Sequence, residues 1–152
     1  MRTHTFESLL AALGQGGVEF ILVGGLAVAV SGYPRATFDL DILVEDSTEN
    51  LERLLTVLSG FGSGSARELS TADFTREEGC IRVNEDFPLD IFTLMNGKTY
   101  ADLLPYSQPH TVANVTIRSL GPKGLIMLKQ GSLRPQDRLD VEVLKRNLEE
   151  DR

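Results

Sequence analysis

Apolar residues along the 152-residue chain recur with two periods, which predict alternating helices and strands. Apolar residues at every third or fourth position predict an amphipathic helix over residues 5–13. The unbroken apolar stretch at residues 20–23 predicts a short buried strand. Small apolar residues follow the glycine pair Gly24 and Gly25, and they predict a closely packed helix that ends near Gly32.

The middle of the chain repeats this alternation. Acidic and apolar residues alternate over residues 38–44, which predicts a second strand. A capping-type start and a glycine stop bound a predicted helix over residues 48–59. Residues 63–79 are typical of a loop that carries at most one irregular strand. Residues 80–95 predict two strands that are joined around residues 84–88.

The last third predicts one strand and two closing helices. The strand is expected over residues 111–120, one helix after Pro122, and the final helix from about Pro135. This order of elements predicts an α/β (α+β) fold in which helices flank a mixed central sheet. We expect residues 1–152 to form a single domain, with closing helices over about residues 122–150.

Composition narrows the class of protein. A hydrophobic content of 41% in a chain of this length supports one compact core. The net charge of -7 argues against a general nucleic-acid coat. Cys80 is the only cysteine, which excludes an internal disulfide framework and suits a reducing compartment, so we expect a cytoplasmic location. The longest apolar stretch is about half the length of a membrane-spanning helix, so we expect no membrane partner.

Two carboxylates on the second predicted strand are candidate metal ligands. Asp39 and Asp41 are two residues apart, so on a strand they share one face at a backbone spacing of roughly 6.6 Å. Both can then reach one divalent cation, and ligands that are all oxygen favour Mg²⁺ or Mn²⁺. The alternative is that they form the solvent-exposed face of an edge strand.

Asp90 is the third candidate, because apolar residues flank it on a predicted strand. Its rivals Glu85 and Asp86 are more typical of turn residues. Three strand carboxylates on one face would hold two cations roughly 3.5 to 4 Å apart, which is the arrangement that orients an attacking oxygen and a leaving phosphate.

The glycine pair offers a place for that phosphate. Gly24 and Gly25 lie between a predicted strand and a predicted helix, where backbone N–H groups can approach a ligand closely. A tight turn that requires a positive φ explains the pair equally well. The surrounding residues match neither a P-loop nor a dinucleotide-binding fingerprint.

Taken together, these motifs resemble the polymerase-beta-like nucleotidyltransferase superfamily, and in particular its small toxin-type or abortive-infection-type branch. The C-terminal residues 128–144 are similar to a later motif of that branch, a lysine followed by an Arg-x-x-Asp-x-x-Asp helix. The N-terminal part of the resemblance runs from the glycine pair through Gly32, Arg35 and Thr37 to the Asp-Leu-Asp sequence. The later aspartate, Asp90, also belongs to it.

The resemblance implies a role for each candidate residue. Gly24 and Gly25 would cradle the triphosphate of a nucleotide. Asp39 and Asp41 would bind the metal ions, and Asp90 would complete the metal site and act as, or assist, the base for an acceptor hydroxyl.

The resemblance also assigns basic residues. Lys129 would reach the phosphates, and Arg35 would do so too or form a salt bridge with a nearby carboxylate. Arg134, Asp137 and Asp140 are expected to fix the closing helix rather than to contact substrate.

One position departs from the superfamily pattern. Many of its members carry a serine within or directly after the glycine pair, where the hydroxyl holds a phosphate, whereas here Leu26 follows Gly25. Phosphate binding at the pair would then depend on backbone N–H groups alone.

The resulting hypothesis is an enzyme that uses Mg²⁺ or Mn²⁺ to transfer a nucleoside monophosphate from an NTP to a hydroxyl. The acceptor could be a tRNA end, a protein side chain or a small molecule, and a partner chain such as an antitoxin is a further candidate. The alternative hypotheses are a non-catalytic nucleotide-binding or partner-binding module of the same fold, and an ordinary α/β domain whose motif match is accidental.

Overall fold

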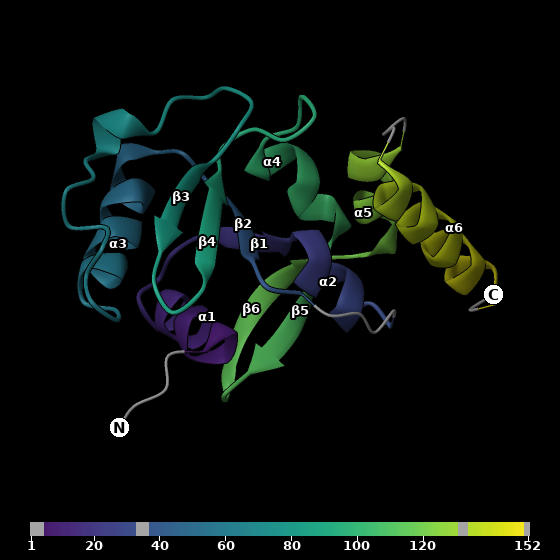
Figure 1. Ribbon diagram of the computed structural model, residues 1–152, viewed down its shortest axis with the longest axis horizontal. Helices are drawn as coiled ribbons and strands as arrows, with labels where there is room; N and C mark the ends of the chain where they lie inside the picture. Colours follow the sequence, from purple (N-terminus) through teal and green to yellow (C-terminus); the bar gives the residue numbers. More distant parts are fainter. Residues whose placement is uncertain (1–4, 33–36, 131–133, 151–152) are drawn as a thin grey trace.

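The computed structural model describes residues 5–32, 37–130 and 134–150. A six-stranded mixed sheet runs through the middle of the molecule, with α3 at one end and the α5–α6 pair at the other (Figure 1). The predicted α/β class with a mixed central sheet and flanking helices is therefore confirmed. The elements are α1 (Phe6–Gln15), β1 (Phe20–Val23), α2 (Gly24–Val30), β2 (Leu40–Val44), α3 (Thr48–Ser59), β3 (Ile81–Asn84), β4 (Pro88–Phe92), α4 (Tyr100–Leu103), β5 (Ser107–Val112), β6 (Val115–Leu120), α5 (Pro122–Lys129) and α6 (Pro135–Glu150).

The strand order is β3-β4-β2-β1-β6-β5. The two central pairs differ in direction, because β1 is antiparallel to β2 whereas β2 is parallel to β4. β1 pairs with β2 along one of its edges and is parallel to β6 along its other edge. Antiparallel hairpins, β3–β4 and β5–β6, form the two edges. This order places β4, far along the chain, directly beside β2.

Local signals explain the helices that the sequence predicted. Ser47 caps α3 by accepting a hydrogen bond from the Asn50 backbone N–H, and Gly60 ends that helix, so the predicted span of residues 48–59 is confirmed. A capping box between Thr5 and Ser8 starts α1. The apolar faces of these helices contribute to one hydrophobic core with the strands.

Residues 63–79 form the predicted loop, with one 3₁₀ turn and no strand. Two other local predictions were wrong. The strand expected from residue 38 begins only at Leu40, which leaves Phe38 outside the sheet. The expected strand over residues 111–120 is the turn and second strand of a hairpin, because Ala113 and Asn114 both have positive φ values, 49° and 66°, and reverse the chain between β5 and β6.

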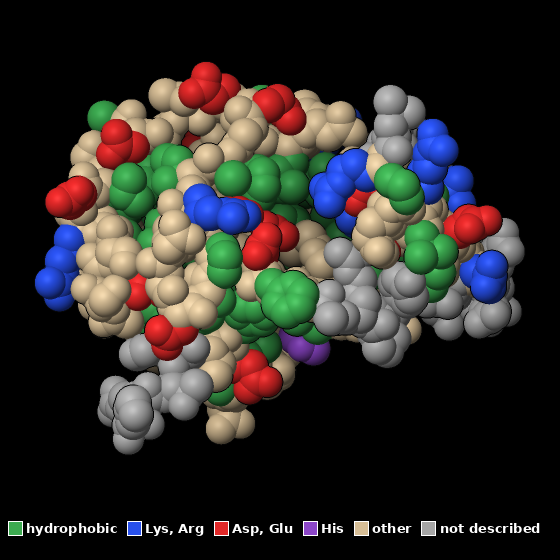
Figure 2. Space-filling view, viewed as in Figure 1, with side chains coloured by type: hydrophobic (Ala, Val, Ile, Leu, Met, Phe, Trp, Pro, Cys, Tyr) green, Lys and Arg blue, Asp and Glu red, His purple; other side chains and the backbone are tan. Residues whose placement is uncertain are grey.

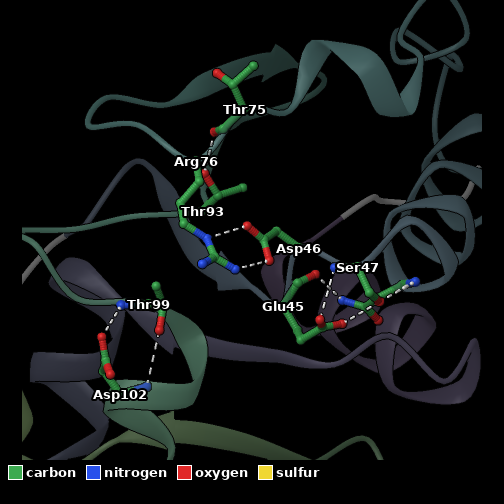
Figure 3. Close-up of polar contacts among 9 residues, drawn as sticks. Glu45, Asp46, Ser47, Thr75, Arg76, Thr93, Thr99 and Asp102 are labelled. Atoms are coloured by element: carbon green, nitrogen blue, oxygen red, sulfur yellow. Dashed lines mark hydrogen bonds and ion pairs between the residues drawn. The ribbon is translucent and has the colours of Figure 1, made fainter.

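Polar clamps fix the long segment between α3 and β3 (Figure 3). The Arg76 guanidinium donates two hydrogen bonds of 2.8 Å to the Asp46 carboxylate, just beyond the end of β2. The Thr93 hydroxyl donates to the Thr75 backbone oxygen at 2.7 Å, which ties the segment to the end of β4. The segment that leads into β3 is therefore held against the sheet.

The helices cover the sheet and extend beyond it. Helix α1 packs on β6 and contacts α3, while α2 packs on β1 and β2 and also contacts α5. Helix α6 contacts α5 at the end of the molecule away from α3 (Figure 1). None of the helices in the described parts of the chain is long and apolar enough to span a bilayer.

Candidate active site

A cleft of about 540 Å³ lies where β1, β2 and β4 approach α5 and the start of α6. It brings together residues that are far apart along the chain. Its walls are formed by Gly24, Gly25, Thr37, Phe38, Asp39, Asp41, Arg82, Asp90, Phe92, Met95, Leu125, Leu128, Lys129, Arg134 and Asp137.

The three candidate carboxylates all line this cleft. Asp41 and Asp90 are register partners on the parallel strands β2 and β4, and their carboxyl groups form a hydrogen bond. Asp39 lies just before β2, and its backbone oxygen accepts a 3.1 Å hydrogen bond from the Thr37 hydroxyl. The intervening Leu40 is fully buried, so the alternation predicted from the sequence holds here.

Asp41 and Asp90 have opposite pKa shifts. Burial, followed by the negative charge and the hydrogen bond of Asp90, raises the pKa of Asp41 to about 7. The hydrogen bonds from Arg82 hold the pKa of Asp90 below its usual range. Without a bound cation, the pair is therefore arranged to share a proton, with Asp41 as the donor and Asp90 as the acceptor.

Arg82 is a site residue that the sequence analysis missed. Its Nε donates to Asp90 Oδ1 at 2.7 Å, and its Nη2 donates to Asp90 Oδ2 at 2.9 Å and to Asp39 Oδ2 at 3.2 Å. Arg82 pairs with Asp90 across the β3–β4 hairpin. That hairpin was predicted, so counting its register outward from the turn would have placed the two residues opposite each other.

Gly24 allows a close approach between β1 and the carboxylates. It has a φ of +73°, and a Cβ added at this position would lie only 2.8 Å from Asp41 Cγ. Any side chain here would therefore collide with the Asp41 carboxyl group. Gly25 is buried beside it and also lines the cleft.

Lys129 lines the cleft, but its ammonium group is bound to α6. It donates to Asp137 Oδ1 at 2.9 Å, and it lies 3.2 Å from Asp140 Oδ2, whose side chain is fully buried. Arg134 approaches Asp137 at 4.0 Å. The Lys129 contacts join α5 to α6. The other predicted phosphate ligand, Arg35, lies outside the described residues.

Apolar side chains line the same cleft and form what we call its apolar wall. It consists of Phe38, Phe92, Met95, Leu125 and Leu128. The Phe38 side chain is 80% exposed, which is unusual for a phenylalanine and leaves its ring available to a ligand. On the face shown in Figure 2, hydrophobic side chains surround a contact between basic and acidic side chains. Sequence reasoning missed this wall, because its members come from segments that are far apart along the chain.

The carboxylates fit a hard divalent cation by their chemistry, although Arg82 now neutralises two of them. All three offer only oxygen donors, and a cation would relieve the repulsion from Asp90 that helps to raise the pKa of Asp41. In the described parts of the chain, no group of three or more His, Cys, Asp or Glu side chains is arranged to hold a metal ion.

Comparisons with known proteins identify the fold. No protein-family model matches the sequence, and no curated protein matches it. The lincosamide antibiotic adenylyltransferase LnuA with lincomycin bound has a TM-score of 0.63 at 15% identity, over 95% of this chain and 98% of that chain. A putative nucleotidyltransferase from Thermotoga maritima has a TM-score of 0.54 at 19% identity, over 94% of this chain and 89% of that one.

A third structure, an antigenic nucleotidyltransferase-like protein from Paracoccidioides brasiliensis, has a TM-score of 0.52 at 16% identity, over 91% of this chain and 74% of that one. The chain therefore has the fold of nucleotidyltransferase structures, as the sequence resemblance implied. None of the three is described as a toxin, so the narrower branch stays a prediction.

Proposed function

We propose that this protein is a metal-dependent nucleotidyltransferase that transfers a nucleoside monophosphate from an NTP to a hydroxyl. The observation that carries the proposal is the pairing of Asp41 with Asp90 on neighbouring strands, with Asp39 close enough to share Arg82 with Asp90. These carboxylates line a cleft beside Gly24 and Gly25, in a fold shared with nucleotidyltransferases.

The proposed chemistry is an in-line displacement at the α-phosphorus. The acceptor oxygen forms a bond to that phosphorus, the bond from it to the bridging oxygen of the β-phosphate breaks, and pyrophosphate leaves. Asp39, Asp41 and Asp90 would hold Mg²⁺ or Mn²⁺, which when bound neutralises charge on the phosphate oxygens. In this proposal Asp90 also takes, or helps to take, the acceptor proton.

Binding of the triphosphate is assigned to the glycine pair, which lines the same cleft next to Asp41. Gly24 and Gly25 carry no side chain, so phosphate oxygens can come close to main-chain N–H groups. Lys129 would have to exchange one of its α6 carboxylate partners for a phosphate. Arg35 is kept as a proposed phosphate ligand.

A small organic molecule is the acceptor that the structure favours. The apolar wall suits a ring or alkyl group better than a polyanion. LnuA, which matches nearly the whole chain, binds the small molecule lincomycin. We keep a tRNA end and a protein hydroxyl as outcomes of the test. A toxin–antitoxin role, a partner chain, a cytoplasmic location and a single domain over residues 1–152 also remain proposals.

A non-catalytic module of the same fold is the second candidate. One observation favours it: Arg82 already neutralises Asp39 and Asp90, as a permanent structural ion pair would. Such a module would bind nucleotide without consuming it, and it would do so whether or not a divalent cation is present.

A labelling experiment separates the two candidates. The protein is incubated with each NTP labelled at the α-phosphate and with small-molecule, RNA and protein fractions of a cell extract, with and without Mg²⁺. We expect Mg²⁺-dependent labelling of one fraction, which Asp39→Ala combined with Asp41→Ala abolishes and the control Asp46→Ala retains. Labelling that survives the double substitution would rule out the proposed mechanism. Nucleotide binding without any label transfer would instead support the module.

A further inference from the structure

Arg82 makes side-chain contacts in addition to the backbone pairing of its strand. It comes from the edge strand β3, which the backbone ladder already pairs with β4. The other arginine clamp, Arg76 with Asp46, joins a loop to the sheet, whereas Arg82 and Asp90 are already opposite each other on paired strands. The ion pair of Arg82 therefore acts mainly on the charges in the cleft.

The position of the guanidinium is specific. Its Nη2 lies 2.9 Å from Asp90 Oδ2 and 3.2 Å from Asp39 Oδ2, so one nitrogen bridges two carboxylates. A cation chelated by the same two carboxylates would need that space between them. The Asp90 side chain is only 8% exposed, whereas that of Arg82 is 50% exposed, so the guanidinium can leave without moving the strand.

We propose that Arg82 is a resident cation that holds the place of the divalent metal ion until the nucleotide arrives. This rests on the proposed function, because it concerns the same carboxylates. The guanidinium must give up its contact with Asp39 before a metal ion can bridge Asp39 and Asp90. Binding of metal alone is therefore weakened, and the protein avoids holding a metal ion without a substrate.

The displaced guanidinium then becomes a ligand for the nucleotide. Arg82 lines the same cleft as Gly24 and Gly25, and an arginine fork binds phosphate oxygens in pairs. A triphosphate that accepts Arg82 removes the competitor from the carboxylates, so nucleotide and metal strengthen each other's binding. Arg82 is thus a positioning residue that couples the two ligands.

The test measures Mn²⁺ affinity of the full chain by electron paramagnetic resonance, first with Mn²⁺ alone and then with a non-hydrolysable ATP analogue. Without nucleotide, Arg82→Gln should bind Mn²⁺ at least about fivefold more tightly than the unmodified protein. A fivefold change is at the lower end of typical couplings between two binding sites. The increase in Mn²⁺ affinity on adding the analogue should be smaller in Arg82→Gln. Arg82→Lys keeps the charge without the fork, so its affinity should lie in between.

The control is Arg76→Gln, which removes the same kind of fork from a carboxylate outside the cleft and should leave Mn²⁺ affinity unchanged. If Arg82→Gln does not fold, Arg82→Lys decides the question, because it should still bind Mn²⁺ more tightly than the unmodified protein. Affinity that is unchanged or weaker in the Arg82 variants, or no Mn²⁺ binding in any form, would overturn the inference.

Label transfer, measured separately, keeps this result distinct from the proposed function. An unmodified protein that transfers label while the Arg82 variants bind Mn²⁺ no more tightly would contradict only the role of Arg82. Tighter Mn²⁺ binding in the variants, with no transfer by any form, would contradict only the transferase.

Discussion

At the scale of one residue, ionised Asp41 lowers the stability of the folded protein. A carboxyl group with a pKa of about 7 in the folded protein and an ordinary pKa in the unfolded chain binds its proton more tightly when folded. Stability is therefore retained at acid pH and falls as the pH rises from about 4 to 7, because ionised Asp41 faces Asp90 at close range. Such a cost is typical of a residue kept for function.

Asp41→Asn is accordingly expected to stabilise the metal-free protein while abolishing transfer. The amide removes the like charge and can still donate to Asp90. We expect the melting temperature at pH 8 to rise by about 2–4 °C, the change that about 1 kcal/mol produces in a domain of this size. The difference from the unmodified protein should shrink towards pH 5, where Asp41 is already protonated.

The matched control for this substitution is Asp46→Asn. Arg76 holds the pKa of Asp46 below its usual range, so the same change there removes a favourable charge and should lower the melting temperature slightly. A fall in melting temperature for both variants would contradict the charge argument at Asp41.

Gly24 gives a second prediction at this scale. Gly24→Ala should destabilise the protein and displace the Asp41 carboxyl group, because it adds a steric collision to an unfavourable positive φ. Gly97→Ala is the matched control, since Gly97 has nearly the same φ, +75°, and open space where the Cβ would lie. The control should cost only the backbone strain, about 1–2 kcal/mol. If urea unfolding shows that Gly24→Ala and Gly97→Ala lose equal free energies of unfolding, neighbouring atoms at Gly24 must move to avoid the collision.

Individual residues differed in how well the sequence located them. Asp39 and Asp41 were singled out because they share one face of a predicted strand, and Asp90 because apolar residues flank it. The structure places all three at one cleft. Arg82 was missed because its role depends on which residue faces it across a hairpin. An arginine on a strand carries no such information by itself.

The closing helices illustrate the scale of whole elements. Helix α6 is held to α5 through Lys129 and two carboxylates, of which Asp140 is fully buried. Because Lys129 also lines the cleft, the packing of α6 fixes one wall of the site.

Asp140→Ala should therefore loosen α6 while leaving the sheet intact. The cost should stay below the roughly 3–5 kcal/mol of a fully stranded buried charge, because Lys129 keeps Asp137. Hydrogen exchange read by mass spectrometry should become faster in α5 and α6 but not in β1 or β2. Lys145→Ala, at an exposed position of α6, is the control and should change neither. Faster exchange across the sheet as well would show that α6 does not act as a separate unit.

Elements with a strong period were predictable, and those set by unusual turns were not. Helix α3 followed from its caps and apolar face, whereas the β5–β6 hairpin was read as one strand because Ala113 and Asn114 lack the glycine that normally marks such a turn. Helix α4 has only four residues, too few for a helical period to be visible.

At the scale of the molecule, sheet order makes the site. The parallel pairing of β2 with β4 brings Asp90 beside Asp41, although 48 residues lie between them in the sequence. Periodicity finds strands but does not say which ones are neighbours, so the sequence could only suppose this proximity. Only the resemblance to nucleotidyltransferases implied that Asp90 completes a site with Asp39 and Asp41.

Net charge gives a prediction at the same scale. At -7, the protein should repel polyanions, so we expect no retention of tRNA in filter binding at about 150 mM salt. Tight tRNA binding that weakens steeply with added salt would contradict this and would move the proposed acceptor from a small molecule to RNA.

The central claim is that Asp39, Asp41 and Asp90 together bind the cation that an NTP brings to the cleft. Crystals grown with Mn²⁺ and a non-hydrolysable ATP analogue test it most directly, because anomalous scattering locates manganese without reference to any model of the chemistry. We predict a manganese peak in contact with all three carboxylates, with the triphosphate against Gly24 and Gly25. A nucleotide bound in the cleft with manganese away from these carboxylates, or with Arg82 still bridging Asp39 and Asp90, would contradict the account.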